Sequence, residues 1–93
     1  MVIGVLRFRL GIYEALSLKD KRRVVKSLKD RFGAKHNISI AEIDDLDRRQ
    51  SATLGAVMIS NDSRFVESAL SKIVDEIRGD GRASLLDYSI ELI

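Results

Sequence analysis

Residues 17–32 read SLKDKRRVVKSLKDRF, the pattern of an amphipathic helix. Its apolar residues recur at spacings that place them on one helical face; they are Leu18, Val24, Val25, Leu28 and Phe32. Ser17 stands three residues before Asp20, as in a capping box at a helix start. Gly33 follows closely, so we expect the helix to end between Gly33 and His36.

Strand patterns surround this helix. Residues 2–12 alternate apolar side chains with arginine or glycine, the two-residue period of a half-buried strand. Residues 38–43 indicate a second strand, with a phase slip near Ala41 that is typical of a bulge. Residues 52–60 are apolar on both faces, as in a central strand. Residues 86–92 alternate again and predict the last strand.

A second helix is expected between the last two strands, capped by residues 61–63 and ended by residues 79–81. Its core stripe is Phe65, Val66, Ala69, Leu70, Ile73, Val74 and Ile77. The element order predicts one α+β domain over residues 1–93, a ferredoxin-like βαββαβ sandwich with two helices on one face of a four-stranded antiparallel sheet. The expected core is Leu6, Phe8, Val25, Leu28, Phe32, Leu70, Ile73, Val74, Tyr88 and Ile90.

The composition limits the chemistry that the chain can perform. It has no cysteine and one histidine, His36, so a thiolate metal site is excluded and a histidine-dependent centre has little to draw on. We expect His36 to interact with the dipole at its helix end and expect no cofactor. Neither a secretion signal nor a membrane-spanning segment is evident, which predicts a cytoplasmic protein.

Charge is distributed unevenly along the chain. Residues 1–36 carry ten Lys or Arg against three Asp or Glu, and residues 37–93 carry six against eleven. The net charges are therefore +7 and −5, which sum to the overall +2. Such a split indicates either a polyanionic partner for the first half or complementary contact of the chain with itself.

The outer face of the first helix is the leading candidate for a binding site. Four cations lie on the side away from the apolar stripe: Lys19, Arg22, Arg23 and Lys26. They form two like-charge pairs at i,i+4, each of which costs about 0.2–0.5 kcal/mol of helix stability. Phosphate binding would explain this arrangement. The alternative is a solvated basic surface that binds nothing.

Three other features have weaker functional interpretations. Glu42, Asp44, Asp45 and Asp47 have oxygen ligands suited to a hard cation but lack the spacing of a calcium loop, so a solvated acidic loop is favoured over a metal site. Phe8 is expected to face the helices, and the third strand has no aromatic residue. The sheet is therefore expected to lack a base-stacking platform. Tyr13 and Tyr88 are expected at an edge or in the core.

A two-layer fold leaves one sheet face uncovered. The residues expected there are apolar: Ile3, Val5, Val57 and Ile59. Exposed apolar area of this kind usually marks an interface. The sequence therefore predicts a homodimer that uses this face or an edge strand.

Five stretches resemble the YlxP-like family of small bacterial proteins of unknown function (DUF503). They are residues 1–6, 17–28, 37–44, 52–55 and 60–62, which read MVIGVL, SLKDKRRVVKSL, NISIAEID, ATLG and SND. The resemblance implies a ferredoxin-like fold and no established activity. Family members are often encoded beside translation initiation factor 2 and ribosome-binding factor A, which implies a link to translation. After Asp44 the family usually has His and Trp, and this chain has neither; no role that rests on them is carried over.

Taken together, these features predict a non-enzymatic cytoplasmic module that contacts RNA or the ribosome through the basic helix. The alternative is a homo-oligomeric interaction domain with no nucleic-acid role. A small enzyme is a third class, because acylphosphatase-like proteins share this topology. Their Gly-x-Val-Gln-Gly-Val-x-x-Arg loop is absent from residues 10–18. A ligand-sensing domain of the same topology is a fourth alternative.

Overall fold

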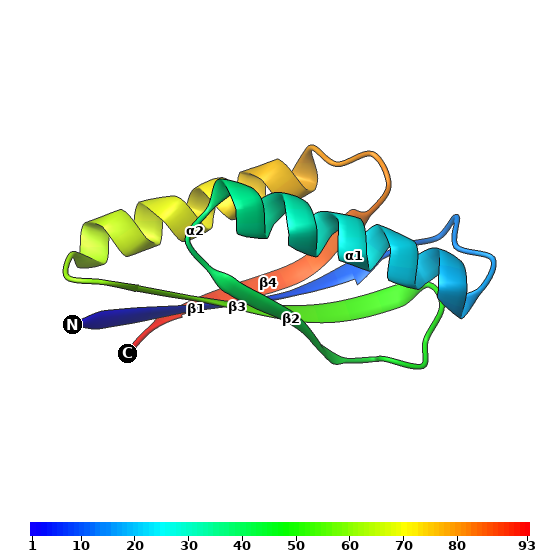
Figure 1. Ribbon diagram of the computed structural model, residues 1–93, viewed down its shortest axis with the longest axis horizontal. Helices are drawn as coiled ribbons and strands as arrows, with labels where there is room; N and C mark the ends of the chain where they lie inside the picture. The colour runs from blue at the N-terminus through cyan, green and yellow to red at the C-terminus, as the bar shows by residue number, and fades with distance from the viewer.

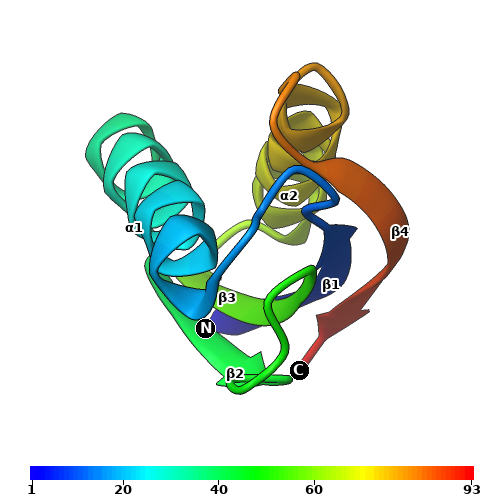
Figure 2. The ribbon, with the colours of Figure 1, turned by 90° about the vertical axis from the view of Figure 1, so that its right-hand side faces the viewer.

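Two helices lie over one face of a four-stranded sheet (Figure 1). The computed structural model describes residues 1–93. The elements in chain order are β1 (Val2–Gly11), α1 (Leu18–Lys35), β2 (Ser39–Asp44), β3 (Ser51–Ser60), α2 (Ser63–Arg78) and β4 (Ser84–Leu92). All strand pairs are antiparallel, in the order β2-β3-β1-β4. The expected ferredoxin-like fold is confirmed, and Figure 2 shows the other sheet face without a helix.

The core lies between the helices and the sheet. Strand alternation directs Leu6, Phe8 and Leu10 of β1 toward the helices, where each is at most 1% exposed. Eight of the ten expected core residues are buried: Leu6, Phe8, Val25, Leu28, Phe32, Leu70, Ile73 and Val74. Ile90 is partly buried and packs against this core.

The prediction for Tyr88 is wrong, because this side chain is 44% exposed. Tyr88 lies opposite Phe8 on the edge strand β4, beside the end of α2. Its ring is covered there by the Arg78 guanidinium, 5.4 Å from the ring centroid. An edge strand has a neighbour on one side only, so its side chains receive less cover than those of a central strand.

A glycine lets α2 approach the sheet closely. A Cβ on Gly4 would stand 2.3 Å from Val66 Cγ1 and 2.8 Å from Leu70 Cδ1. No side chain larger than hydrogen fits this position without a shift of the Val66 and Leu70 side chains of α2. Neither helix combines the length and the apolar character needed to cross a membrane.

The start of α1 follows the expected capping pattern with one variation. The Ser17 Oγ accepts a hydrogen bond from the Asp20 backbone N–H at 3.1 Å. The Asp20 carboxylate accepts from the N–H of Leu16, one residue before the cap. The helix ends at Lys35, within the expected interval.

The bulge in β2 lies two residues beyond the expected position. The register with β3 slips between Glu42 and Asp44, so the extra residue is Ile43 rather than Ala41. Ile43 packs over Gly55, where a Cβ would stand 3.2 Å from Ile43 Cδ1. The glycine therefore provides the space that the bulged side chain occupies.

Candidate functional site

The four predicted cations of α1 all lie on the exposed face of the helix. Lys26 forms an ion pair with Asp30, with Nζ 2.6 Å from Oδ2 and both side chains more than half exposed. Lys19, Arg22 and Arg23 have no carboxylate oxygen within 4 Å. Three of the four positive charges are therefore available to an external anion.

The surface beside these cations is shallowly hollowed on two sides of α1. Arg22 and Lys26 line a hollow between α1 and β2, together with Lys29. Arg23 lines a separate hollow on the other side, where Arg82 also contributes. The cations thus extend over the whole outer surface of the helix and do not converge on one enclosed pocket.

Part of the charge asymmetry along the chain is neutralised within the fold. Five of the nine ion pairs join a cation of residues 1–36 to a carboxylate of residues 37–93: Arg9–Asp87, Lys21–Glu42, Arg31–Asp80, Lys35–Glu76 and His36–Glu76. The cations of the first half that remain without a carboxylate partner are Arg7, Lys19, Arg22, Arg23 and Lys29. Four of these five lie on α1.

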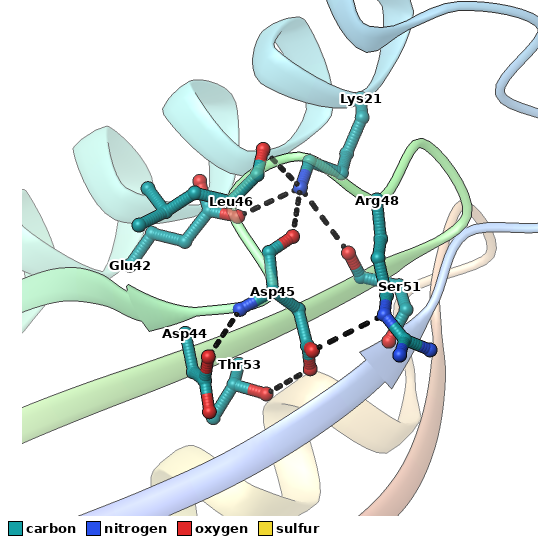
Figure 3. A network of polar contacts seen from close by, with 8 residues as sticks. All are labelled: Lys21, Glu42, Asp44, Asp45, Leu46, Arg48, Ser51 and Thr53. Atoms are coloured by element: carbon teal, nitrogen blue, oxygen red, sulfur yellow. Dashed lines mark hydrogen bonds and ion pairs between the residues drawn. The ribbon is translucent and has the colours of Figure 1, made fainter.

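The structure reveals a buried lysine that the sequence reasoning missed. Lys21 is 0% exposed, in line with Val25 and Leu28 on the inner face of α1. Its Nζ lies 2.9 Å from Glu42 Oε2 and donates to backbone carbonyls of the β2–β3 connection and of the first residue of β3 (Figure 3). Those carbonyls belong to Asp45, Leu46 and Ser51, at 2.9, 3.2 and 3.2 Å. Lys21, Val25 and Leu28 have the i, i+4, i+7 spacing of one helix face, and this spacing in the sequence could have indicated that Lys21 is buried.

The acidic loop after β2 is part of the same network. Asp45 has φ 60°, the left-handed conformation, which is uncommon outside glycine. Its carboxylate accepts from the Thr53 hydroxyl at 2.8 Å and lies 3.5 Å from Arg48 Nε (Figure 3). Because Glu42 turns inward to Lys21, the carboxylates do not converge, and no group of three or more potential metal ligands forms. The loop is therefore shaped by Lys21.

A second polar network joins the two helices. His36 ends α1, and its Nε2 lies 2.9 Å from Oε2 of Glu76 on α2, so this ring pairs with a carboxylate and not with the carbonyls of its own helix. The Lys35 ammonium, whose Nζ lies 2.9 Å from Oε1, has the largest effect on the pKa of Glu76 and lowers it. Burial raises that pKa and His36 lowers it again, so it lies below its usual 4.5.

Asp80, just after α2, is buried between two arginines. Its Oδ2 lies 3.0 Å from Arg31 of α1 and 3.2 Å from Arg82. Burial is the largest single influence on its pKa and raises it. The hydrogen bonds from Arg82 and the charges of both arginines outweigh burial, so the pKa of Asp80 lies below its usual 3.8.

The predicted dimer-face residues form adjacent cross-strand pairs. Ile3 lies opposite Ile59, and Val5 lies opposite Val57, on the sheet face that carries no helix. Val57 is 43% and Ile59 58% exposed. These pairs form one apolar area at the end of the sheet where β1 begins.

The opposite end of the same face has different chemistry. Arg7 and Arg9 follow Val5 along β1, and both are exposed. Phe8 faces the helices as expected, but Tyr13, expected at an edge or in the core, lies over Gly11 and is 62% exposed. One exposed aromatic ring therefore stands on the open face, although no strand residue supplies it.

Two comparisons with known proteins, with a family model and with curated proteins, agree on one family. Residues 3–90 match the model of the family described as "Protein of unknown function (DUF503)". The uncharacterized protein YlxP of Bacillus subtilis (strain 168) is 34% identical over 73 residues, which cover 78% of this chain and 79% of YlxP. A crystal structure of an amidase of the hydantoinase/carbamoylase family from Burkholderia phymatum matches with a TM-score of 0.48 at 16% identity. That match covers 100% of this chain but 28% of the amidase, and it carries no inference about activity.

Proposed function

We propose that this chain, which belongs to the DUF503 family of proteins of unknown function, is a non-enzymatic cytoplasmic module that contacts RNA or the ribosome through the outer face of α1. The observation that carries the proposal is the absence of a carboxylate partner at Lys19, Arg22 and Arg23. Four other cations of the first half, Arg9, Lys21, Arg31 and Lys35, form ion pairs with carboxylates of the second half.

Energetics supports an external anion at this surface. Lys19 and Arg23, like Arg22 and Lys26, are four residues apart on one exposed helix face, and such like-charge pairs disfavour the helix. Cations near a helix start also oppose the helix dipole. Bound phosphates would reduce both the repulsion between the like charges and the unfavourable interaction with the helix dipole. Release of counterions from RNA would add affinity.

A salt series with a matched control tests the proposal. The affinity of the protein for single-stranded RNA and for purified ribosomes is measured by filter binding. Arg22→Glu with Lys26→Glu should strongly weaken binding, while circular dichroism confirms an intact fold. The control is Arg64→Glu with Lys72→Glu, which makes the same charge change at two exposed, unpaired cations of α2.

The outcomes distinguish binding through the outer face of α1 from a general attraction between RNA and the net positive charge of the protein. The logarithm of the wild-type binding constant should fall with the logarithm of the salt concentration, with a slope of about −0.7 for each phosphate contacted. Equal losses in the α1 and α2 variants would show that only net charge matters. Wild-type protein that binds neither RNA nor ribosomes at low salt would refute the proposal.

The apolar pairs on the open face support a second function, assembly of two copies. Ile3, Val5, Val57 and Ile59 are contiguous across β1 and β3, and no element of the chain covers them. Burial of apolar surface drives such association at about 25 cal/mol per Å². A second copy would supply the missing cover through the same area, as in a two-fold dimer.

Light scattering after gel filtration tests this assembly. The wild type should have twice the 10.4 kDa chain mass. Val57→Lys with Ile59→Lys should give the single-chain mass. Ser89→Lys, at an exposed position toward the other end of the same face, should leave the dimer intact. A wild-type protein that has the single-chain mass at high micromolar concentration would contradict the dimer.

A further inference from the structure

The open sheet face carries one aromatic ring, and a glycine determines where that ring lies. Gly11 is the last residue of β1, and the strand alternation directs its missing side chain to the open face. A Cβ there would stand 2.6–2.7 Å from Cζ, Cε2 and Oη of Tyr13. Because these three atoms are almost equally distant, the ring turns a face to the Gly11 backbone. Tyr13 as a whole is 62% exposed, so the rest of its side chain meets solvent.

The backbone around Tyr13 is fixed to the neighbouring loop. The Tyr13 carbonyl accepts a hydrogen bond from Gln50 Nε2 at 3.0 Å. The N–H of Ile12, a residue only 1% exposed, donates to the Gln50 carbonyl at 2.9 Å. These contacts position the ring before any ligand arrives, which lowers the entropy cost of binding.

Two arginines continue from this ring along the same face of β1. Arg9 and Arg7 stand two and four residues before Gly11, and two residues of a strand span about 6.6–6.8 Å. Arg7 has no carboxylate within 4 Å. Its neighbours in register are Gly55, which is covered by Ile43, and the small Ser89, and the Arg7 side chain is exposed between them.

Carboxylates are also present near the row of side chains formed by Tyr13, Arg9 and Arg7. Arg9 lies 3.5 Å from Asp87 on β4, and both side chains are at least 49% exposed. Such an exposed pair contributes at most about 1 kcal/mol, so an incoming phosphate can compete for Arg9. Asp44 on β2 lies opposite Thr53, one strand away from Arg9.

We infer that Tyr13, Arg9 and Arg7 form a binding site for a single-stranded RNA segment, with an unpaired base stacked on Tyr13 and adjacent phosphates on the two arginines. An aromatic ring beside cations is how proteins hold single strands without reading their sequence. A base inside a duplex is stacked on its neighbours and cannot reach Tyr13. The site is an open row of side chains, and none of the five main hollows of the surface includes Tyr13, which favours a strand over a free nucleotide.

This site is separate from the surface of the proposed function. The cations of α1 lie on the outer side of the helix layer, whereas the row lies on the helix-free side of the sheet (Figure 2). The two surfaces can therefore be tested independently, with variants that change one and not the other.

The tyrosines provide a direct spectroscopic test. The chain has two tyrosines and no tryptophan, so in a Tyr88→Phe protein the intrinsic fluorescence comes from Tyr13 alone. Titration with single-stranded oligo(A) RNA should quench this fluorescence to saturation. The same concentration of nucleotides as AMP, or as a duplex, should quench it much less.

Affinities of side-chain variants complete the test. Tyr13→Leu should weaken single-strand binding about 5- to 140-fold, the range that corresponds to about 1–3 kcal/mol per stacked base. Tyr13→Phe keeps the stacking face and should bind like the wild type. Arg7→Ser with Arg9→Ser should reduce the magnitude of the salt slope by about 1.4, or 0.7 for each lost phosphate contact.

Two results would overturn the inference. One is a Tyr13→Leu protein that binds single strands as tightly as the wild type while Arg22→Glu with Lys26→Glu strongly weakens binding; the α1 proposal would then stand alone. The other is AMP or duplex RNA that quenches Tyr13 as strongly as the single strand. A loss at Tyr13→Leu with no effect of the α1 variant would support this site and refute the α1 surface.

Discussion

Replacing Lys21 with methionine tests the buried network that shapes the β2–β3 loop. The substitution keeps the length of the aliphatic chain but removes the ammonium group. It leaves Glu42 Oε2 and the carbonyls of Asp45, Leu46 and Ser51 without their shared donor. The Glu42 side chain is only 11% exposed, so water replaces little of what the carboxylate loses.

The expected loss is a large part of the total stability. Removing one partner of a buried ion pair costs about 3–5 kcal/mol, because the remaining charge stays buried without compensation. A domain of this length unfolds with a free energy of about 5–14 kcal/mol. Since each kcal/mol shifts the Tm of such a domain by about 4–8 °C, the Tm of Lys21→Met should fall by at least about 12 °C.

Urea unfolding followed by circular dichroism measures this loss. The matched control is Lys19→Met, two residues away and exposed, which should change the free energy of unfolding by less than about 0.5 kcal/mol. Adding Glu42→Leu to Lys21→Met should restore part of the stability, because it removes the unpaired carboxylate. A Lys21→Met protein within about 1 kcal/mol of the wild type would refute the reasoning.

Three further predictions concern stability. Gly4→Ala should lower the free energy of unfolding by about 1–3 kcal/mol in urea, because its Cβ would stand 2.3 Å from Val66 Cγ1. Gly33→Ala, in α1 with no atom within 4 Å of the new Cβ, should instead raise it by up to about 1 kcal/mol. The lowered pKa values of Glu76 and Asp80 stabilise the fold fully above their usual 4.5 and 3.8, so urea midpoints should drop as the pH falls below these values, and less steeply in Asp80→Asn.

The sequence was sufficient for the fold because each element has a clear period and its own end signals. Ser17 caps α1 and Asp62 caps α2, as their positions before the apolar stripes predict. The two faces of β3 also separate as expected, with Leu54 and Met58 buried and Val57 exposed. These features depend on neighbours in the chain, which a single sequence displays.

The errors concern contacts between distant elements. Tyr88 alternates like a core residue, but its exposure depends on where α2 ends above the edge strand. Lys21 shares a helix face with Val25 and Leu28, but the acceptors that allow its burial come from β2, the following loop and the start of β3, which a single sequence does not place beside it. The place of Tyr13 depends on the absence of a side chain at Gly11, which no periodicity reveals.

The two ends of the open sheet face can serve different purposes because they are far apart. Ile3 and Gly11 are eight residues apart on β1, which corresponds to about 26 Å of extended strand. The apolar pairs lie near the start of β1, but Arg7 follows Val5 after two residues, about 6.6–6.8 Å along the strand. Two packed sheets lie about 10 Å apart, so a second copy seated on Val5 and Val57 would stand close to Arg7 and farther from Tyr13. Self-association and single-strand binding therefore meet at Arg7 in the middle of the face, while Ile3 and Tyr13 at its two ends serve one function each.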